Sequence, residues 1–206
     1  MSTTRENLIY ATIELMLRNG YHAVSVDEIC AWANVKKGSF YHFFDSKTNL
    51  TLQAMDHHYQ ESKSVCDGIF FSTFSPIERF QNFFEYIYRT QADLHEKLGH
   101  VCGALSVTLG SEMVCHDDIR KKASEIIRSY EKYYECALAD LVSSGEIRAD
   151  TNIENTSSNI SCYIIGKVTI ARIRNSLDFL KDFNAGVFQI AGMRSSKHDA
   201  LQEKNF

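Results

Sequence analysis

Apolar residues recur every three or four positions along nearly the whole chain, which is the spacing of amphipathic helices. This pattern predicts about nine helices, over residues 4–19, 26–33, 37–43, 47–65, 76–94, 102–109, 118–144, 153–175 and 177–193. Pro76, the only proline, suits the first turn of one of them. No stretch alternates like a strand between hairpin turns, so the sequence predicts an all-α fold.

The stretch from Ser25 to Leu50 has a local organisation of its own. Ser25 and Glu28 have the S-x-x-E spacing of a capping box, which predicts a short helix beginning at Val26. Asn34 tolerates the left-handed backbone conformation, so this helix should end in a turn of a few residues before the next helix. Two short helices joined by such a turn form a helix-turn-helix, whose second helix enters the major groove of DNA.

The same stretch resembles the TetR family of bacterial transcriptional regulators, whose first helix ends in Gly-Tyr or Gly-Phe before the pattern T/S-V-x-x-I-A-x-x-A-G-V-S-x-G-x-x-Y-x-x-F-x-x-K-x-x-L. The matching residues are Gly20-Tyr21, Ser25-Val26, Ile29, Ala33, Val35, Gly38, Tyr41, Phe44, Lys47 and Leu50. The departures are Cys30, Asn34 and Lys36, which stand where the family has Ala, Gly and Ser or Thr. The resemblance implies a DNA-binding domain over 1–50 and a helical effector-binding and dimerisation domain over 51–194, followed by a polar tail over 195–206.

Seven residues are candidates for contacts with DNA: Ser25, Lys36, Lys37, Ser39, Tyr41, His42 and Lys47. The start of a recognition helix points into the groove, so we expect Lys37 and Ser39 at base edges. Tyr41, His42 and Lys47 should instead meet phosphates, because the end of that helix and the start of the next one meet the backbone. Lys36 cannot cap the helix as a hydroxyl would, but its charge can reach a phosphate.

Charge alone does not mark the chain as DNA-binding, because its net charge is −4. Residues 1–50 hold five basic and five acidic groups, which leaves 17 basic and 21 acidic groups in the remainder. The position of Lys36, Lys37 and Lys47 therefore matters more than the total. The acidic remainder argues against a nucleic-acid surface over the whole protein.

The last two predicted helices carry more apolar surface than one small core absorbs. A two-helix contribution to a four-helix dimer interface explains the excess, and the resembled family dimerises there. We expect Ile164, Val168, Phe179, Phe183 and Val187 at this interface. The alternative is a helix fully buried within a monomer.

Aromatic residues are abundant in the helices from Pro76 onwards, and an apolar cavity between bundle helices would suit a flat or hydrophobic effector. The candidate lining residues are Phe80, Phe84, Cys102, Leu105, Tyr130 and Tyr134, on the predicted helices 76–94, 102–109 and 118–144. The alternative for each aromatic residue is an ordinary place in the core.

Cys102 is a separate case, because the segment HVCGALSVTLGSE resembles a subset of the TetR family in which a Cys opens the sixth helix beside the effector cavity. A thiol at a helix N-terminus gains thiolate character, and Lys167 would add to it by pointing inward. This hypothesis predicts a sensor of electrophiles or oxidants. The alternative is a small, buried hydrophobic residue.

Other classes of protein lack support in the sequence. The six cysteines have no CxxC spacing, and no motif of a metal site, a cofactor site or an enzyme stands out, so we expect reduced thiols, no metal, no cofactor and no catalysis. The polar and apolar residues at the start follow helical spacing, and no apolar run approaches the roughly 20 residues of a membrane span, so we expect a cytoplasmic protein.

These observations predict a homodimeric transcriptional regulator, and specifically a repressor that binds a near-palindromic operator. A small hydrophobic, aromatic or electrophilic effector would release it from the double-stranded DNA. The alternative is a helical ligand-binding or protein-interaction module without DNA-binding activity.

Overall fold

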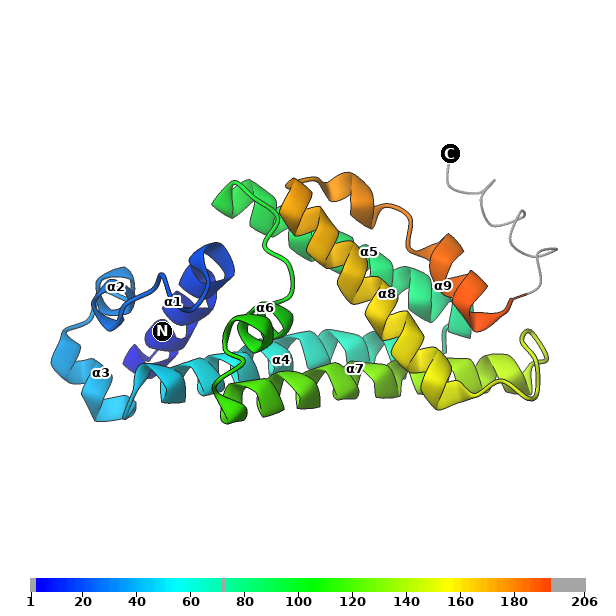
Figure 1. Cartoon of the computed structure of the whole chain (residues 1–206), viewed down its shortest axis with the longest axis horizontal. Helices are drawn as coiled ribbons and strands as arrows, with labels where there is room; N and C mark the ends of the chain where they lie inside the picture. Colours follow the sequence, from blue (N-terminus) through cyan, green and yellow to red (C-terminus); the bar gives the residue numbers. More distant parts are fainter. Residues whose placement is uncertain (1–2, 72, 194–206) are drawn as a thin grey trace.

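A computed structural model describes residues 3–71 and 73–193 of the chain, and the predicted polar tail lies outside these residues. The described part contains nine α-helices and one short 3-10 helix and no strand, which confirms the all-α prediction (Figure 1). The α-helices are α1 (Thr4–Asn19), α2 (Val26–Trp32), α3 (Lys37–Phe43), α4 (Lys47–Phe70), α5 (Pro76–Leu98), α6 (Leu105–Glu112), α7 (Asp117–Ser143), α8 (Ile153–Arg174) and α9 (Asn184–Ala191). The 3-10 helix η1 covers Leu177–Leu180.

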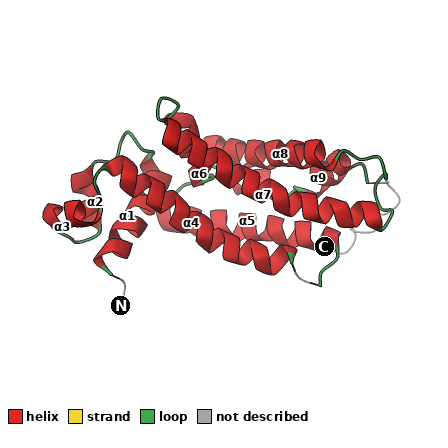
Figure 2. Ribbon diagram, turned by 90° about the horizontal axis from the view of Figure 1, so that it is seen from below, coloured by secondary structure: helices red, strands yellow, loops and turns green. Residues whose placement is uncertain are grey.

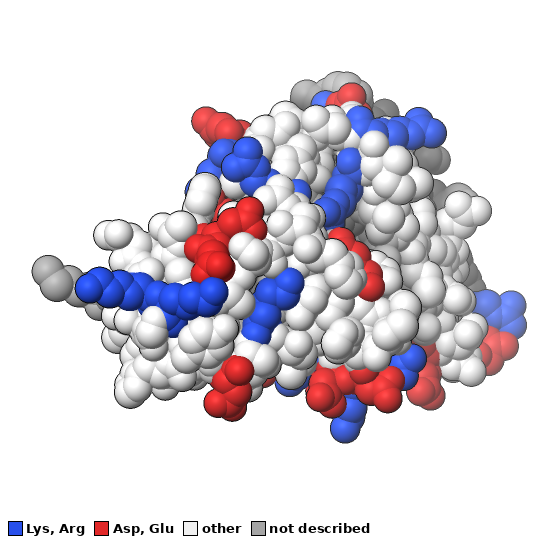
Figure 3. Space-filling view, turned by 60° about the vertical axis from the view of Figure 1, so that its left-hand side comes forward, with Lys and Arg blue, Asp and Glu red and all other residues white. Residues whose placement is uncertain are grey.

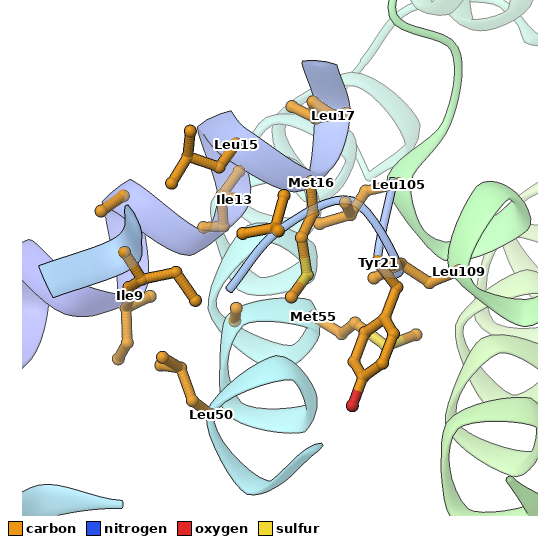
Figure 4. Packing of buried hydrophobic residues seen from close by; sticks show 14 of the residues in the cluster. Ile9, Ile13, Leu15, Met16, Leu17, Tyr21, Leu50, Met55, Leu105 and Leu109 are labelled. Carbon is orange, nitrogen blue, oxygen red and sulfur yellow. The ribbon is translucent and has the colours of Figure 1, made fainter. Parts of the chain in front are cut away.

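Helices α1, α2 and α3 form a unit at one end of the molecule, which we call the head (Figure 1). The buried residues of α1 pack against Phe40 and Phe44, which are almost completely buried. The same cluster of buried residues continues into α6 through Leu105 and Leu109, which lie close to Met16 and Tyr21 in Figure 4. The head therefore shares its core with the helix α6.

The body consists of α5 to α9 and is joined to the head by α4 (Figure 2). A second cluster of buried residues fills it, in which Phe70, Phe80 and Tyr134 lie within about 6 Å of one another, centroid to centroid, in mostly edge or tilted arrangements. Helix α7 contacts α4, α5, α6 and α8 and so forms the middle of this bundle.

Several helix ends differ from the predicted ones: α4 and α5 continue to Phe70 and Leu98 instead of 65 and 94, and the starts of α6 and α7 also differ. Helix α6 begins at Leu105 instead of 102, since Gly103 adopts a left-handed conformation and both ends of the Gln91 side-chain amide bind its backbone. Helix α7 follows His116, and Asp117, which we predicted as its cap, is instead its first residue and pairs with Arg120.

The predicted helix 177–193 is wrong, because it is divided into η1 and α9. The hydroxyl of Tyr163 donates to the Asp182 carbonyl at 3.4 Å, so a side chain binds this carbonyl at the break between the two helices. Gly186 then lies against the Tyr163 ring, where a Cβ atom would lie only 2.2 Å from the ring. None of the described helices is long and apolar enough to span a membrane.

Candidate DNA-binding surface and effector cavity

The helix-turn-helix of the head is organised by the groups that the sequence indicated. The Ser25 hydroxyl accepts from the Glu28 N–H at 3.1 Å, and the Ser25 N–H donates to the Glu28 carboxylate at 2.7 Å. The bonds that Ser25 donates hold the pKa of the Glu28 carboxyl below its usual value. Asn34 has a φ of 53°, which turns the chain before α3. Lys36 precedes α3 without a side-chain cap, as expected for a lysine.

The predicted DNA-contacting residues of α3 lie mostly on an open face of the head. Lys36, Lys37, Tyr41 and His42 are exposed, with Tyr41 57% exposed, whereas Ser39 is half-buried. Figure 3 turns this end of the molecule forward and shows basic and acidic side chains interspersed over it. The surface can therefore meet DNA through individual cations, not through one continuous basic patch.

Lys37, the candidate for base contact, has an acidic partner that the sequence reasoning did not foresee. Its ammonium group lies 2.8 Å from the carboxylate of Asp27 on α2, and both side chains are largely exposed. The hydrogen bond to Asp27 raises the pKa of Lys37. The two groups together present a donor and an acceptor beside the start of α3, where base edges are met in a docked helix-turn-helix.

Lys47, predicted to meet a phosphate, has a structural role within the head. Its ammonium group donates to the carbonyls of Tyr21 and Val24 at 3.0 and 2.8 Å, and lies 3.8 Å from the centre of the Tyr21 ring. Burial lowers the pKa of Lys47. These contacts use two of its three N–H donors to join the start of α4 to the loop between α1 and α2.

Glu112, at the end of α6, makes a second connection to the same loop. Its carboxylate accepts from the Tyr21 N–H at 2.7 Å and covers Gly20 so closely that a Cβ atom there would lie 2.5 Å from Glu112 Oε1. Gly20 has a φ of 79°, a conformation that favours glycine, and a Cβ atom there would displace the Glu112 carboxylate. The sequence indicated Gly20 as the end of α1 but gave no signal for its contact with Glu112.

The body contains a cavity of about 140 Å³. Its walls come from α4, α5, α7 and α8 and from the segment 103–107 at the start of α6. His58 and Ser62 of α4 are in this lining, so the helix that joins the head to the body borders the cavity directly. The sequence reasoning missed both residues because it considered α4 only as a connection.

Of the six candidate effector-binding residues, Tyr130 and Tyr134 line the cavity and the other four do not. Phe84 stacks on Phe183 with ring centroids 5.0 Å apart, and Phe80 lies 6.0 Å from Phe84, so both fill the core. Leu105 is buried in the core that α6 shares with the head. Phe80, Phe84, Cys102 and Leu105 therefore lie outside the lining of this cavity.

Cys102 also lacks the surroundings of a reactive thiol. It precedes the first residue of α6 by three positions, it is buried, and its thiol lies 3.6 Å from the His100 carbonyl. Burial raises the pKa of Cys102, although Arg172 opposes this effect. Lys167 lies instead near the rings of Tyr163 and Phe183. These contacts favour the alternative of a small, buried hydrophobic residue.

Four of the five residues predicted at the dimer interface face the interior of their own protomer. Ile164 and Val168 line the cavity, while Phe183 and Val187 are buried. Phe179 is half-buried and lies under Arg174. The outward face of α8 is formed by a different set, namely Asn155, Asn159, Cys162, Gly166, Thr169, Ile170 and Ile173. None of these seven side chains is charged, and Ile173 is 72% exposed.

Within residues 3–71 and 73–193, no three side chains of His, Cys, Asp or Glu gather as a metal site would require.

Comparisons with known proteins agree with the helix-turn-helix head. Residues 8–54 match the family described as bacterial regulatory proteins, tetR family. An uncharacterised HTH-type transcriptional regulator of Lactococcus lactis subsp. lactis is 27% identical over 133 residues, which cover 64% of this chain and 66% of that protein. The HTH-type transcriptional repressor DhaR of Mycobacterium sp. (strain GP1) is 24% identical over 186 residues, 90% of each chain.

A regulatory protein TetR from Rhodobacter sphaeroides has a similar fold over most of this chain. Its crystal structure superposes with a TM-score of 0.82 and 25% identity, covering 92% of this chain and 99% of that one. The match at the head, the relatives over most of the chain and this structural likeness agree. Residues 8–54 therefore match the TetR family of bacterial regulatory proteins, and the chain as a whole is similar to helix-turn-helix transcriptional regulators.

Proposed function

We propose that the protein is a homodimeric repressor that binds a near-palindromic operator and releases it when an effector enters the cavity. The observation that carries this proposal is the pair of contacts at Tyr21. Lys47 and Glu112 hold the same loop of the head, and they belong to α4 and α6, whose residues also border the cavity.

The short helix α6 connects the cavity directly to the head. The segment 103–107 includes the first residues of α6 and borders the cavity, while Glu112 ends the helix at the head. An effector that moves the start of α6 changes the position of Glu112 against Gly20 and Tyr21. The effector lowers operator affinity only to the extent that it binds the arrangement unable to bind DNA more tightly, and a coupling of about 1–3 kcal/mol changes affinity roughly 5- to 150-fold.

The outward face of α8 supports the dimer. Its seven residues are uncharged, although the exposed charged residues Glu154 and Arg174 stand near the two ends of α8. It exposes Ile170 and Ile173, and no other element of the protein lies within 4 Å of the place where a Cβ of Gly166 would stand. A second copy of α8 can therefore approach closely around Gly166 and cover the exposed isoleucines. Two heads related by such a two-fold axis would meet half-sites about 34–36 Å apart, or at a multiple of this distance.

DNA binding can be tested by fluorescence anisotropy with labelled duplexes from the region upstream of the protein's own gene. We expect binding to one near-palindromic duplex, and Lys36→Ala should weaken it and reduce the slope of its salt dependence by about 1. Lys132→Ala, on the exposed surface of α7, is the matched control and should bind as the wild type does. Absence of binding to any upstream duplex would contradict the proposal and favour a helical ligand-binding or protein-interaction module.

A further inference from the structure

The charge of the cavity wall restricts what can bind inside it. Within the described part of the chain, no side chain of Asp, Glu, Lys or Arg lines the cavity. An ionised ligand in such a site would lose its hydration without meeting an opposite charge, and burial of an unpaired charge is strongly unfavourable. The wall therefore selects against ions of either sign.

His58, Tyr130 and Tyr134 of the wall are neutral at pH 7, because burial disfavours the charged form of each. Burial lowers the pKa of His58, with Glu61 opposing the effect and His57 adding to it. Burial also raises the pKa of Tyr130 and of Tyr134. A neutral imidazole offers one donor and one acceptor, so His58 can exchange a hydrogen bond with a neutral ligand.

Several polar groups of the wall are already occupied. The Gln91 amide donates to the Gly103 carbonyl at 3.0 Å and accepts from the Gly103 N–H at 2.9 Å. The Ser62 hydroxyl accepts from Tyr86 at 3.2 Å. In contrast, the ring of His58 makes no hydrogen bond to any residue among 3–71 and 73–193. His58 is therefore a polar group of the wall with capacity for a ligand, and the hydroxyls of Thr90, Ser106 and Ser161 are others.

The volume of the cavity and the absence of a thiol among the described residues of its lining restrict the class of ligand further. A cavity of about 140 Å³ is close to the ~150 Å³ of an apolar cavity that takes up benzene, so it fits about one ring. No cysteine among the described residues lines it, which leaves no nucleophilic thiol to form an adduct.

We infer that the cavity binds, reversibly, an uncharged molecule of about one aromatic ring that carries a single polar group, which hydrogen-bonds to His58. This inference rests on the proposed function, which assigns the cavity to an effector. It excludes organic acids, ammonium compounds and electrophiles that act by modifying Cys102.

Isothermal titration calorimetry of the full-length protein without DNA tests the inference with four compounds of one shape. Benzamide and benzyl alcohol are neutral, benzoate carries a negative charge and benzylammonium a positive one. We expect the neutral pair to bind at least about 10-fold more tightly than either ion. Equal affinity for an ion, or no binding of either neutral compound, would overturn the inference.

Two variants test the position and the contact. Val107→Phe places a larger side chain in the wall and should abolish binding, whereas Val114→Phe, at a position that is 56% exposed, should leave it unchanged. His58→Phe keeps an aromatic ring but removes the two ring nitrogens, so it should weaken benzamide binding about 10-fold more than toluene binding. Unchanged benzamide affinity in both Val107→Phe and His58→Phe would place the ligand elsewhere. Because no DNA is present, these results do not depend on operator binding. Ligand binding in the cavity would therefore still be established if the protein did not act as a repressor.

Discussion

Phe40 and Phe44 fill the centre of the head, whereas Tyr130 and Tyr134 border a cavity in the body. The head is held by the Ser25–Glu28 capping box and by the contacts of Tyr21 with Lys47 and, from much later in the chain, with Glu112. The body brings five separate segments of the chain around a space of about 140 Å³. A filled core holds one shape, while an unfilled one can change shape when a ligand enters. On the proposed function, the effector changes how the head is positioned and leaves the packing inside the head unchanged.

Removing the centre of the head should have the largest effect. Phe40→Ala leaves a cavity at a completely buried position and should lower the free energy of unfolding of the head by about 3–5 kcal/mol. Urea unfolding followed by the fluorescence of Trp32, the only tryptophan, measures it, since Trp32 lies in α2. The neighbouring Tyr41→Ala is the control and should change stability by less than about 0.5 kcal/mol. A loss of similar size in both variants would contradict a filled head core.

Ile173→Glu should break the dimer without disturbing the body. The side chain is 72% exposed in the protomer, so the variant should fold, run as a monomer in sedimentation velocity and bind the operator about 100-fold more weakly. Phe183→Glu is the contrast, because it places a carboxylate in the core beside Phe84 and should unfold the body. A dimeric Ile173→Glu protein with full operator affinity would exclude the outward face of α8 as the interface.

Glu112→Gln should weaken the connection between the two regions while preserving both. The amide keeps the shape of the side chain, but its oxygen is uncharged and accepts a weaker hydrogen bond from the Tyr21 N–H. The effector-induced loss of operator affinity should therefore shrink by about 5-fold. Operator titrations with and without benzamide measure it, with Glu96→Gln, at an exposed position of α5, as the control. If benzamide weakened operator binding as much in Glu112→Gln as in the wild type, the effect of the ligand would reach the head through α4 alone.

The smallest effect should come from Asp27→Asn. Loss of this carboxylate removes the partner of Lys37 and a negative charge near DNA, so affinity for unrelated duplexes should rise about 2- to 5-fold. Preference for the operator should decrease at the base position beside Lys37. Competition titrations with single-base operator variants measure both. A uniform change at every base position would show that Asp27 takes no part in base selection.

The sequence predicted the head better than the body because the determinants of the head are close in the chain. The capping box joins Ser25 to Glu28, and Asn34 turns the chain by its own backbone preference. The cavity depends on the direction in which each helix faces in the bundle. Helical periodicity therefore predicted that Tyr130 and Tyr134 of α7 and Phe80 and Phe84 of α5 all face inward. It could not tell which of these inward-facing rings border the cavity and which fill the core.

Contacts between distant residues explain the remaining errors. The contact of Gln91 with Gly103 sets the start of α6, and that of Tyr163 with Asp182 lies where the last predicted helix is divided. On α8 the apolar stripe with Ile164 and Val168 faces the protomer core, whereas the outward face has mixed, uncharged residues without a periodic signal. A repeating pattern thus identified the buried face of α8 and not the face available to a second copy.

We propose that a ligand in the cavity controls the affinity of the head for operator DNA. Fluorescence anisotropy of the operator duplex, titrated with wild-type protein in the presence and absence of saturating benzamide, tests it directly. Benzamide should weaken operator binding by the wild-type protein roughly 5- to 150-fold. Operator binding by the Val107→Phe protein should not change when benzamide is added. Identical operator affinity with the cavity saturated and unsaturated, as judged by calorimetry on the same protein, would contradict it.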